Sequence, residues 1–188
     1  MRAFIAIKLP PDIKNALTGI QDKLKPNLPK LNWIKPTNLH LSLKFLGEIS
    51  EQQLQSSQQI IARIIKTALP FEIKLETLGV FPDDRQARII WIGTTQPPAQ
   101  LKQSVEQLEN EFLGSSIPRE QRSFQAHITL GRIKNPINHA DLEKAINDLK
   151  SGITDMNLKF NFQGMALFQS VLGPGGPAYS ILKEEFLK

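Results

Sequence analysis

Two short segments of the sequence each combine a histidine with a hydroxyl residue two positions later. The first reads His-Leu-Ser-Leu from His40, and the second reads His-Ile-Thr-Leu from His127. Because side chains alternate between the two faces of a β-strand, His40 shares a face with Ser42, and His127 shares a face with Thr129. The intervening aliphatic residues would anchor the other face in a core. Each strand is therefore expected to present one imidazole beside one hydroxyl.

Two imidazoles and two hydroxyls suit an in-line displacement at phosphorus. One imidazole can take a proton from the attacking water while the other protonates the departing ribose oxygen, because the pKa of histidine is about 6.5. The hydroxyls can donate hydrogen bonds to the non-bridging oxygens, where negative charge has to be held. A strained cyclic phosphate would need no metal for this step. One such motif alone more often marks a structural histidine, but two copies among only three histidines favour catalysis.

Three further side chains are candidates for binding a substrate. Lys44 has the strand parity of His40 and could point toward the substrate, whereas Phe45 has the opposite parity and is expected in the core. Arg132 follows a glycine, where a β-bulge could turn its guanidinium toward a phosphate, and a surface position at a strand end is an equal alternative. Tyr179, the only tyrosine, could stack on a base, although an ordinary strand position suits it as well.

The composition excludes several other chemistries. The chain has no cysteine, and therefore no disulfide, thiolate metal site or cysteine nucleophile. No matched carboxylate stands near either motif to complete a metal site with two histidines, since the nearest paired acids, Asp83 and Asp84, fall on an expected turn. Neither a metal nor a cofactor is predicted. His139 follows Asn138 at an expected helix start and is interpreted as a helix-terminus residue.

The charge and the length of the chain bear on its partners and its location. The net charge is +5 over 188 residues, which favours an anionic partner, although many proteins are mildly basic for no specific reason. The first residues are interrupted by lysine and proline too early for a signal peptide, and no apolar run is long enough to span a bilayer. We therefore predict a cytoplasmic protein without a membrane partner. Nothing in the sequence demands more than a monomer.

Strands and helices alternate along the chain, and the second half repeats the order of the first. Apolar residues at every third or fourth position predict helices, and short apolar runs bounded by proline or glycine predict strands. The predicted strands are 3–9, 39–46, 71–78, 87–92, 124–133, 156–168 and 178–186, and the predicted helices are 12–25, 51–69, 98–113 and 139–149. A turn rich in glycine and proline, 173–177, joins the last two strands as a hairpin. The two histidines lie nearly half the chain apart, which indicates an internal duplication.

With these flanks the chain resembles the 2H phosphoesterase superfamily, which is named for its two His-x-(Thr/Ser)-x motifs. It is most similar to the RNA 2′,3′-cyclic phosphodiesterase branch, historically called the 2′-5′ RNA ligase family. The segments that carry the resemblance are 2–7, Trp33, 38–48, 79–82, 87–88, 91–93, 124–132, 170–172 and 176–179. The resemblance covers nearly the whole chain. Ser42 stands where threonine is commoner and Gly131 where alanine is usual, but serine keeps the hydroxyl.

The resemblance implies an α+β fold of two pseudo-symmetric α/β lobes whose antiparallel sheets face each other across a central cleft. We expect one bilobal domain over residues 1–188. Its lobes would lie near 1–94 and 95–188, and an exchange of strands between the lobes is left open.

The resemblance also implies a reaction, in which a 2′,3′-cyclic phosphate on RNA or a nucleotide is opened to a 2′-phosphomonoester without a metal. His40 would donate a proton to the leaving 3′ oxygen and His127 would accept one from water, although the pseudo-symmetry would allow the roles to be exchanged. Ser42 and Thr129 would bind the phosphate.

Several alternatives remain open. The same fold could act on 2′-5′ linked oligonucleotides or on ADP-ribose cyclic phosphate. It could also join tRNA halves, which would need tight positioning of both ends against competing water, and tRNA fragments are candidate partners in either direction. A non-catalytic module that binds nucleotides or RNA is the alternative of a different class, and the intact motifs argue against it.

Overall fold

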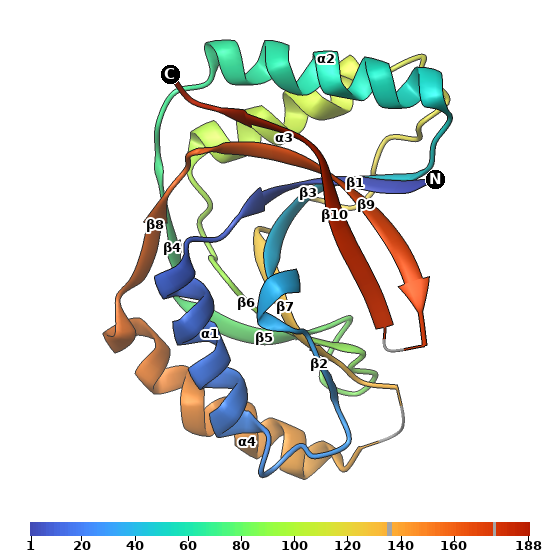
Figure 1. Ribbon diagram of the computed structural model, residues 1–188. Coiled ribbons are helices and arrows are strands. Elements are labelled where there is room, and N and C mark those ends of the chain that lie inside the picture. Colours follow the sequence, from blue (N-terminus) through green and yellow to red (C-terminus); the bar gives the residue numbers. More distant parts are fainter. Residues whose placement is uncertain (135–136, 175) are drawn as a thin grey trace.

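The computed structural model describes residues 1–134, 137–174 and 176–188 as a mixed structure of helices and antiparallel strands (Figure 1). The helices are α1 (Pro11–Leu24), α2 (Glu51–Thr67), α3 (Ala99–Glu111) and α4 (His139–Ile153), with 3-10 turns at Pro36–Asn38 and Thr154–Met156. The strands are β1 (Arg2–Lys8), β2 (Asn32–Trp33), β3 (His40–Glu48), β4 (Glu72–Leu75), β5 (Thr77–Phe81), β6 (Ile89–Gly93), β7 (His127–Arg132), β8 (Leu158–Asn161), β9 (Gly164–Gly173) and β10 (Gly176–Phe186). Within this described part, no helix is both long and apolar enough to cross a membrane.

The two histidine strands lie side by side in the middle of the main sheet. The strand order is β10-β9-β1-β3-β7-β6-β5, and β2 pairs with the far end of β7. β3 and β7 meet through the pair Leu41 and Ile128, which ties the two halves of the sheet together. A separate two-stranded sheet is formed by β4 and β8. All these pairings are antiparallel, so the expected α+β fold with antiparallel sheets is confirmed.

Each half of the main sheet takes strands and a covering helix from both halves of the chain. Helix α2 contacts β9 and β10, and α3 contacts β3, whereas α4 contacts β5 and α1 contacts β7 (Figure 1). Helix α1 follows β1 in the chain but packs on β7 and β8, and α3 follows β6 but packs on β3. Because the helices cross over in this way, neither half of the sheet is complete without the other.

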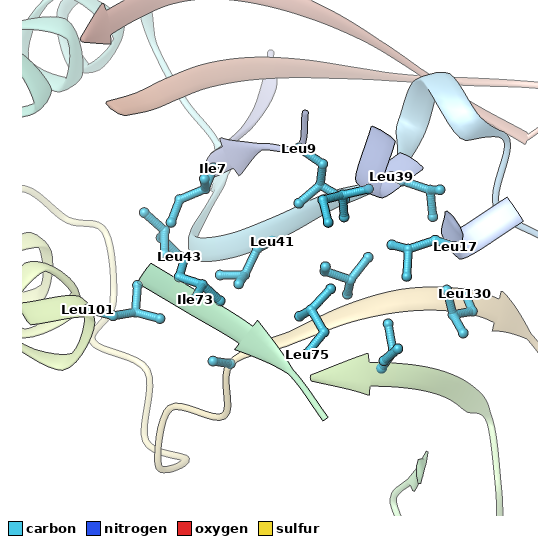
Figure 2. Close-up of a cluster of buried hydrophobic side chains, with 14 of the residues drawn as sticks. Ile7, Leu9, Leu17, Leu39, Leu41, Leu43, Ile73, Leu75, Leu101 and Leu130 are labelled. Atoms are coloured by element: carbon cyan, nitrogen blue, oxygen red, sulfur yellow. The ribbon is translucent and has the colours of Figure 1, made fainter. Parts of the chain in front are cut away.

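The apolar side chains next to each histidine anchor the motif strands in the main core. Leu41 and Ile128 are fully buried, as the alternation predicts. Figure 2 shows Leu41 and Leu43 of β3 in one cluster with Leu17 of α1 and Leu130 of β7. A fully buried side chain of this size stabilises a fold by about 1.5–3 kcal/mol. The aliphatic residues next to the motif histidines therefore fix the strands that carry those histidines.

The chain changes sheets at two points where the sequence predicts unbroken strands. The predicted strand 71–78 divides into β4 and β5, and the predicted strand 156–168 divides into β8 and β9. Apolar runs do not show such a division, because the residues on both sides of it are buried. At the second division Gly164 has a φ of +153°, and a Cβ there would lie 2.0 Å from the Glu185 carbonyl oxygen. Only glycine allows β9 and β10 to approach so closely.

Other elements differ from the predictions mainly at their ends. The strand β3 continues past Gly47, which adopts a φ of +72°, and the short β2 was not predicted. His139 begins α4, where the Asn138 side chain accepts a hydrogen bond from the Ala140 amide, as expected of a helix terminus. The predicted hairpin between β9 and β10 is confirmed by the pairing of Gly173 with Gly176. Its central residue, Gly175, lies outside the described residues.

The close approach of β6 to β7 makes Gly93 a test of this architecture. Gly93 pairs with His127, and a Cβ at this position would lie 2.2 Å from the Ala126 carbonyl oxygen. We expect Gly93→Ala to lower the free energy of unfolding by more than about 2 kcal/mol in urea denaturation, because the two strands must separate. The control is Gly152→Ala in α4, where a Cβ meets open space and should stabilise the helix by about 0.5–1 kcal/mol. Equal stability of the two variants would contradict this view of the strand contact.

Candidate active site

The four motif residues are brought together on one face of the sheet, which we call the histidine face. The antiparallel pair Leu41 and Ile128 points to the core. In this register His40 lies opposite Thr129, and Ser42 lies opposite His127, with all four side chains on the other face. All four are half-buried, in contrast to their fully buried neighbours. The alternation read from the sequence thus holds for both motifs.

Both histidines are held in the same way by the backbone. His40 Nδ1 lies 2.7 Å from the Asn38 carbonyl oxygen, and His127 Nδ1 lies 2.8 Å from the Gln125 carbonyl oxygen. A carbonyl oxygen only accepts, so each Nδ1 carries the proton and donates it. This arrangement fixes each ring and leaves Nε2 as the nitrogen that can exchange a proton with a substrate.

Aromatic rings surround His40. The Phe4 ring lies 4.8 Å from the imidazole, Tyr179 meets it edge-on at 5.3 Å, and Phe168 lies 6.1 Å away. Tyr179 is held there in part because the Asn38 side chain donates a hydrogen bond to the Pro177 carbonyl on the same strand. The structure therefore places Tyr179, which the sequence singled out, next to His40, together with two phenylalanines that it did not.

A second, smaller aromatic group flanks His127. Phe81 meets the imidazole edge-on at 4.9 Å, and Trp91 lies 6.2 Å away. The Phe81 and Trp91 rings stack on each other at 4.9 Å. The predicted strand 71–78 ends before Phe81, whereas the structure makes Phe81 the last residue of β5. A repeat of alternating apolar residues over 77–81 is the signal that could have extended this strand.

Burial in these aromatic surroundings lowers the pKa of both histidines. Burial, partly offset by the bond to the Asn38 carbonyl, lowers the pKa of His40 from 6.5 to about 4, and the positive charge of Arg132 adds to the effect. Burial likewise lowers the pKa of His127, again with a contribution from Arg132. Both imidazoles are therefore neutral at pH 7 in the protein without a substrate.

Arg132 lies on the histidine face because β7 contains a bulge. Thr129 pairs with Trp91 and Gly131 pairs with Ile90, so that Leu130 is the extra residue. The bulge reverses the alternation, and Arg132, five residues after His127, becomes an exposed side chain whose charge acts on both histidines. The bulge expected at Gly131 occurs one residue earlier, at Leu130.

A β-bulge in β3 makes the predictions for Lys44 and Phe45 wrong. Leu43 is the extra residue there, because Ser42 pairs with Ala6 and Lys44 already pairs with Ile5. Lys44 consequently points away from the histidine face and is buried, with its ammonium 2.7 Å from a carboxylate oxygen of Glu109. Phe45 is 64% exposed and lies on the histidine face, 6.0 Å from the Phe4 ring. The alternation of faces along a regular strand therefore predicted the wrong face of the sheet for each of these two residues.

The donor groups available at the site are imidazole nitrogens, hydroxyls and a guanidinium. Across the described parts of the chain, no group of three or more histidine and carboxylate side chains is placed to hold a metal ion. Two neutral imidazoles, two hydroxyls and one positive charge suit an anionic, tetrahedral group that exchanges protons on two sides.

The sequence pattern of the family described as LigT like Phosphoesterase matches the chain twice, over residues 7–91 and 92–179. The chain belongs to this family. The two matches correspond to the two halves of the chain, each of which supplies one histidine strand to the centre of the sheet. The internal duplication inferred from the spacing of the motifs is thus supported independently.

Relatives of this phosphoesterase cover almost its whole length. A protein of Methanothermobacter thermautotrophicus named RNA 2′,3′-cyclic phosphodiesterase is 32% identical over 96% of this chain and 95% of its own. A protein of the same name from Methanocaldococcus jannaschii is 31% identical over 98% of this chain and 99% of its own.

Solved structures share the fold. A crystal structure of a Thermus thermophilus protein superposes with a TM-score of 0.82 at 28% identity, covering 100% of this chain and 98% of the other. E. coli LigT complexed with 3′-AMP superposes with a TM-score of 0.76 at 26% identity, covering 99% of this chain and 97% of the other.

The lowered pKa of His40 predicts a pH dependence of stability. Between pH 6.5 and about 4 the unfolded chain binds a proton at this residue that the folded protein does not bind, so the folded state loses stability as the pH falls through this range. From pH 7 to pH 4.5 we expect the wild type to lose roughly 2–3 kcal/mol more unfolding free energy than His40→Asn. Urea denaturation of both proteins at the two pH values measures the difference. Parallel losses in the two proteins would show that burial does not depress this pKa.

Proposed function

We propose that this phosphoesterase is an RNA 2′,3′-cyclic phosphodiesterase that hydrolyses the cyclic phosphate to a 2′-phosphomonoester. The observation that carries the proposal is the pairing of His40-x-Ser42 with His127-x-Thr129 on adjacent central strands. Relatives of nearly equal length are named for this activity. E. coli LigT, a structural neighbour, has been crystallised with 3′-AMP and with ATP, which supports recognition of nucleotides by the shared fold.

In the proposed reaction one proton enters the site and one leaves it. His127 Nε2 accepts a proton from water as the water oxygen bonds to phosphorus. The bond from phosphorus to the 3′ oxygen breaks, and protonated His40 donates its Nε2 proton to that oxygen. The products are a 2′-phosphomonoester and a free 3′ hydroxyl, and exchange with solvent resets both imidazoles. The carbonyl partners of the two Nδ1 atoms keep the reactive nitrogens pointed at the substrate.

The remaining polar groups would hold the phosphate. The hydroxyls of Ser42 and Thr129 lie beside the imidazoles and can donate to the non-bridging oxygens. The guanidinium of Arg132 can pair with the same oxygens in two parallel hydrogen bonds. Tyr179 next to His40, and the exposed Phe45 beside the Phe4 ring, offer aromatic surface for the ribose or the base. Fragments of tRNA as the RNA substrate, and a monomeric enzyme, remain predictions from the sequence.

The central test is hydrolysis of a short RNA that ends in a 2′,3′-cyclic phosphate, with excess EDTA present. We expect a 2′-phosphate product at an unchanged rate, and a loss of at least about a hundredfold in kcat for both His40→Ala and His127→Ala, since each removes one proton transfer. His139→Ala is the matched control, because this third histidine begins α4 and should leave the rate unchanged. A rate that collapses with EDTA, or full activity in either motif variant, would refute the two-histidine reaction.

A second substrate separates the acid from the base. In a phosphodiester with a nitrophenolate leaving group, the nitrophenolate leaves as a stable anion without a proton. Hydrolysis of this ester therefore does not need the general acid. We expect His40→Ala to recover most of the wild-type rate on this ester, whereas His127→Ala remains inactive on both substrates. Recovery in His127→Ala instead would exchange the two roles.

A further inference from the structure

The two motif strands contain the same irregularity at the same distance from their histidines. In β3 and in β7 the extra residue of the bulge stands three positions after the histidine, at Leu43 and at Leu130. In both strands this shift places the residue five positions after the histidine, Phe45 or Arg132, on the histidine face. What holds each bulge therefore decides which side chains meet the substrate.

The bulge in β7 is held from behind by Gln21 of α1. The Gln21 side chain is 1% exposed, and its amide nitrogen lies 2.8 Å from the carbonyl oxygens of both Leu130 and Ile34. The Leu130 oxygen also accepts from the Ile34 amide at 2.9 Å, so the carbonyl of the extra residue is fully occupied. Gly131 leaves room for the Trp33 ring beside the bulge, because a Cβ at this position would lie 3.1 Å from that ring.

The bulge in β3 is held by a buried ion pair. The Lys44 and Glu109 side chains are 2% and 7% exposed, and the Lys44 ammonium lies 2.7 Å from the carboxylate and 3.2 Å from the Pro118 carbonyl oxygen. The Glu120 amide donates to the same carboxylate oxygen at 3.3 Å. Without the bulge Lys44 would face the other way and leave Glu109 buried without its cation, which is strongly unfavourable.

We infer that Gln21 and the Lys44–Glu109 pair are positioning residues, which hold the two bulges and thereby set Arg132 and Phe45 on the histidine face. None of the three lies on that face, so they act on the substrate only through these two side chains. The inference deepens the proposed function and rests on it for its kinetic test. It assigns a role to three buried polar residues that the proposed reaction does not use.

A double-mutant cycle tests the Gln21 arm. Gln21→Met keeps the length of the side chain but removes the amide, and we expect kcat/KM on the cyclic-phosphate RNA to fall about tenfold, mainly through KM, as Arg132 loses its orientation. In an Arg132→Met background the same change should cost less than about twofold. Ser57→Ala is the control, since this buried hydroxyl bonds only within α2 and should leave kinetics unchanged in both backgrounds. An equal loss in both backgrounds, or wild-type kinetics for Gln21→Met, would overturn the inference.

The ion-pair arm uses the double variant Lys44→Met with Glu109→Met. Replacing both charges by apolar groups removes the ion pair without leaving a buried charge, so the thermal midpoint should stay close to that of the wild type. We expect kcat/KM to fall severalfold in this folded protein, and the loss to vanish in a Phe45→Ala background. Full activity of the double variant, or the same loss with and without Phe45, would show that the pair only stabilises the fold.

Affinity for inorganic phosphate, measured by calorimetry, separates the two proposals. If the wild type fails to hydrolyse the RNA, the proposed function fails, and the Gln21 and Arg132 cycle is then read from phosphate affinity alone. Hydrolysis by the wild type together with additive effects in the cycle would instead overturn only the positioning role.

Discussion

The antiparallel contact between β3 and β7 brings the two halves of the active site together. A single residue pair, Leu41 with Ile128, points into the core and leaves the four motif side chains on the opposite face. The crossed helices then make this contact unavoidable, because α1 must cover β7 and α3 must cover β3 before either half-sheet has a complete core. A site built from both halves of a duplicated chain therefore forms only when the whole domain is folded.

Alternation in a strand predicted the faces of the motif residues correctly and failed two residues later. From His40 to Ser42 the strand is regular, so the faces of the histidine and the serine follow from sequence alone. The bulge that exchanges Lys44 and Phe45 has no local signal, because its cause is Glu109, a carboxylate far along the chain. In β7 the glycine before Arg132 made a bulge one of two equal expectations, so the sequence left the face of Arg132 open.

The aromatic surroundings of the histidines were hidden for a different reason. The strand β1 is buried on both faces, so its sequence has no alternation to show that Phe4 faces His40 while Ile5 faces the main core. Phe168 lies on the adjacent β9, where the same ambiguity applies. Tyr179 could be singled out only because it is the sole tyrosine, and its place beside His40 depends on the pairing of β10 with β9.

The two environments are unequal although the chain is duplicated, and the inequality suits the proposed chemistry. His40 is packed against three rings, and its pKa falls to about 4, so an imidazolium there is a strong acid that readily protonates a departing alkoxide oxygen. At neutral pH such an acid is almost entirely deprotonated until an anionic phosphate lies beside it and raises its pKa. Arg132 opposes this protonation of His40, since its positive charge lowers the pKa of both histidines until the phosphate neutralises that charge. Protonation of the donor would thus be coupled to the arrival of the substrate, and the bulge that positions Arg132 would also set how strongly the two events are linked.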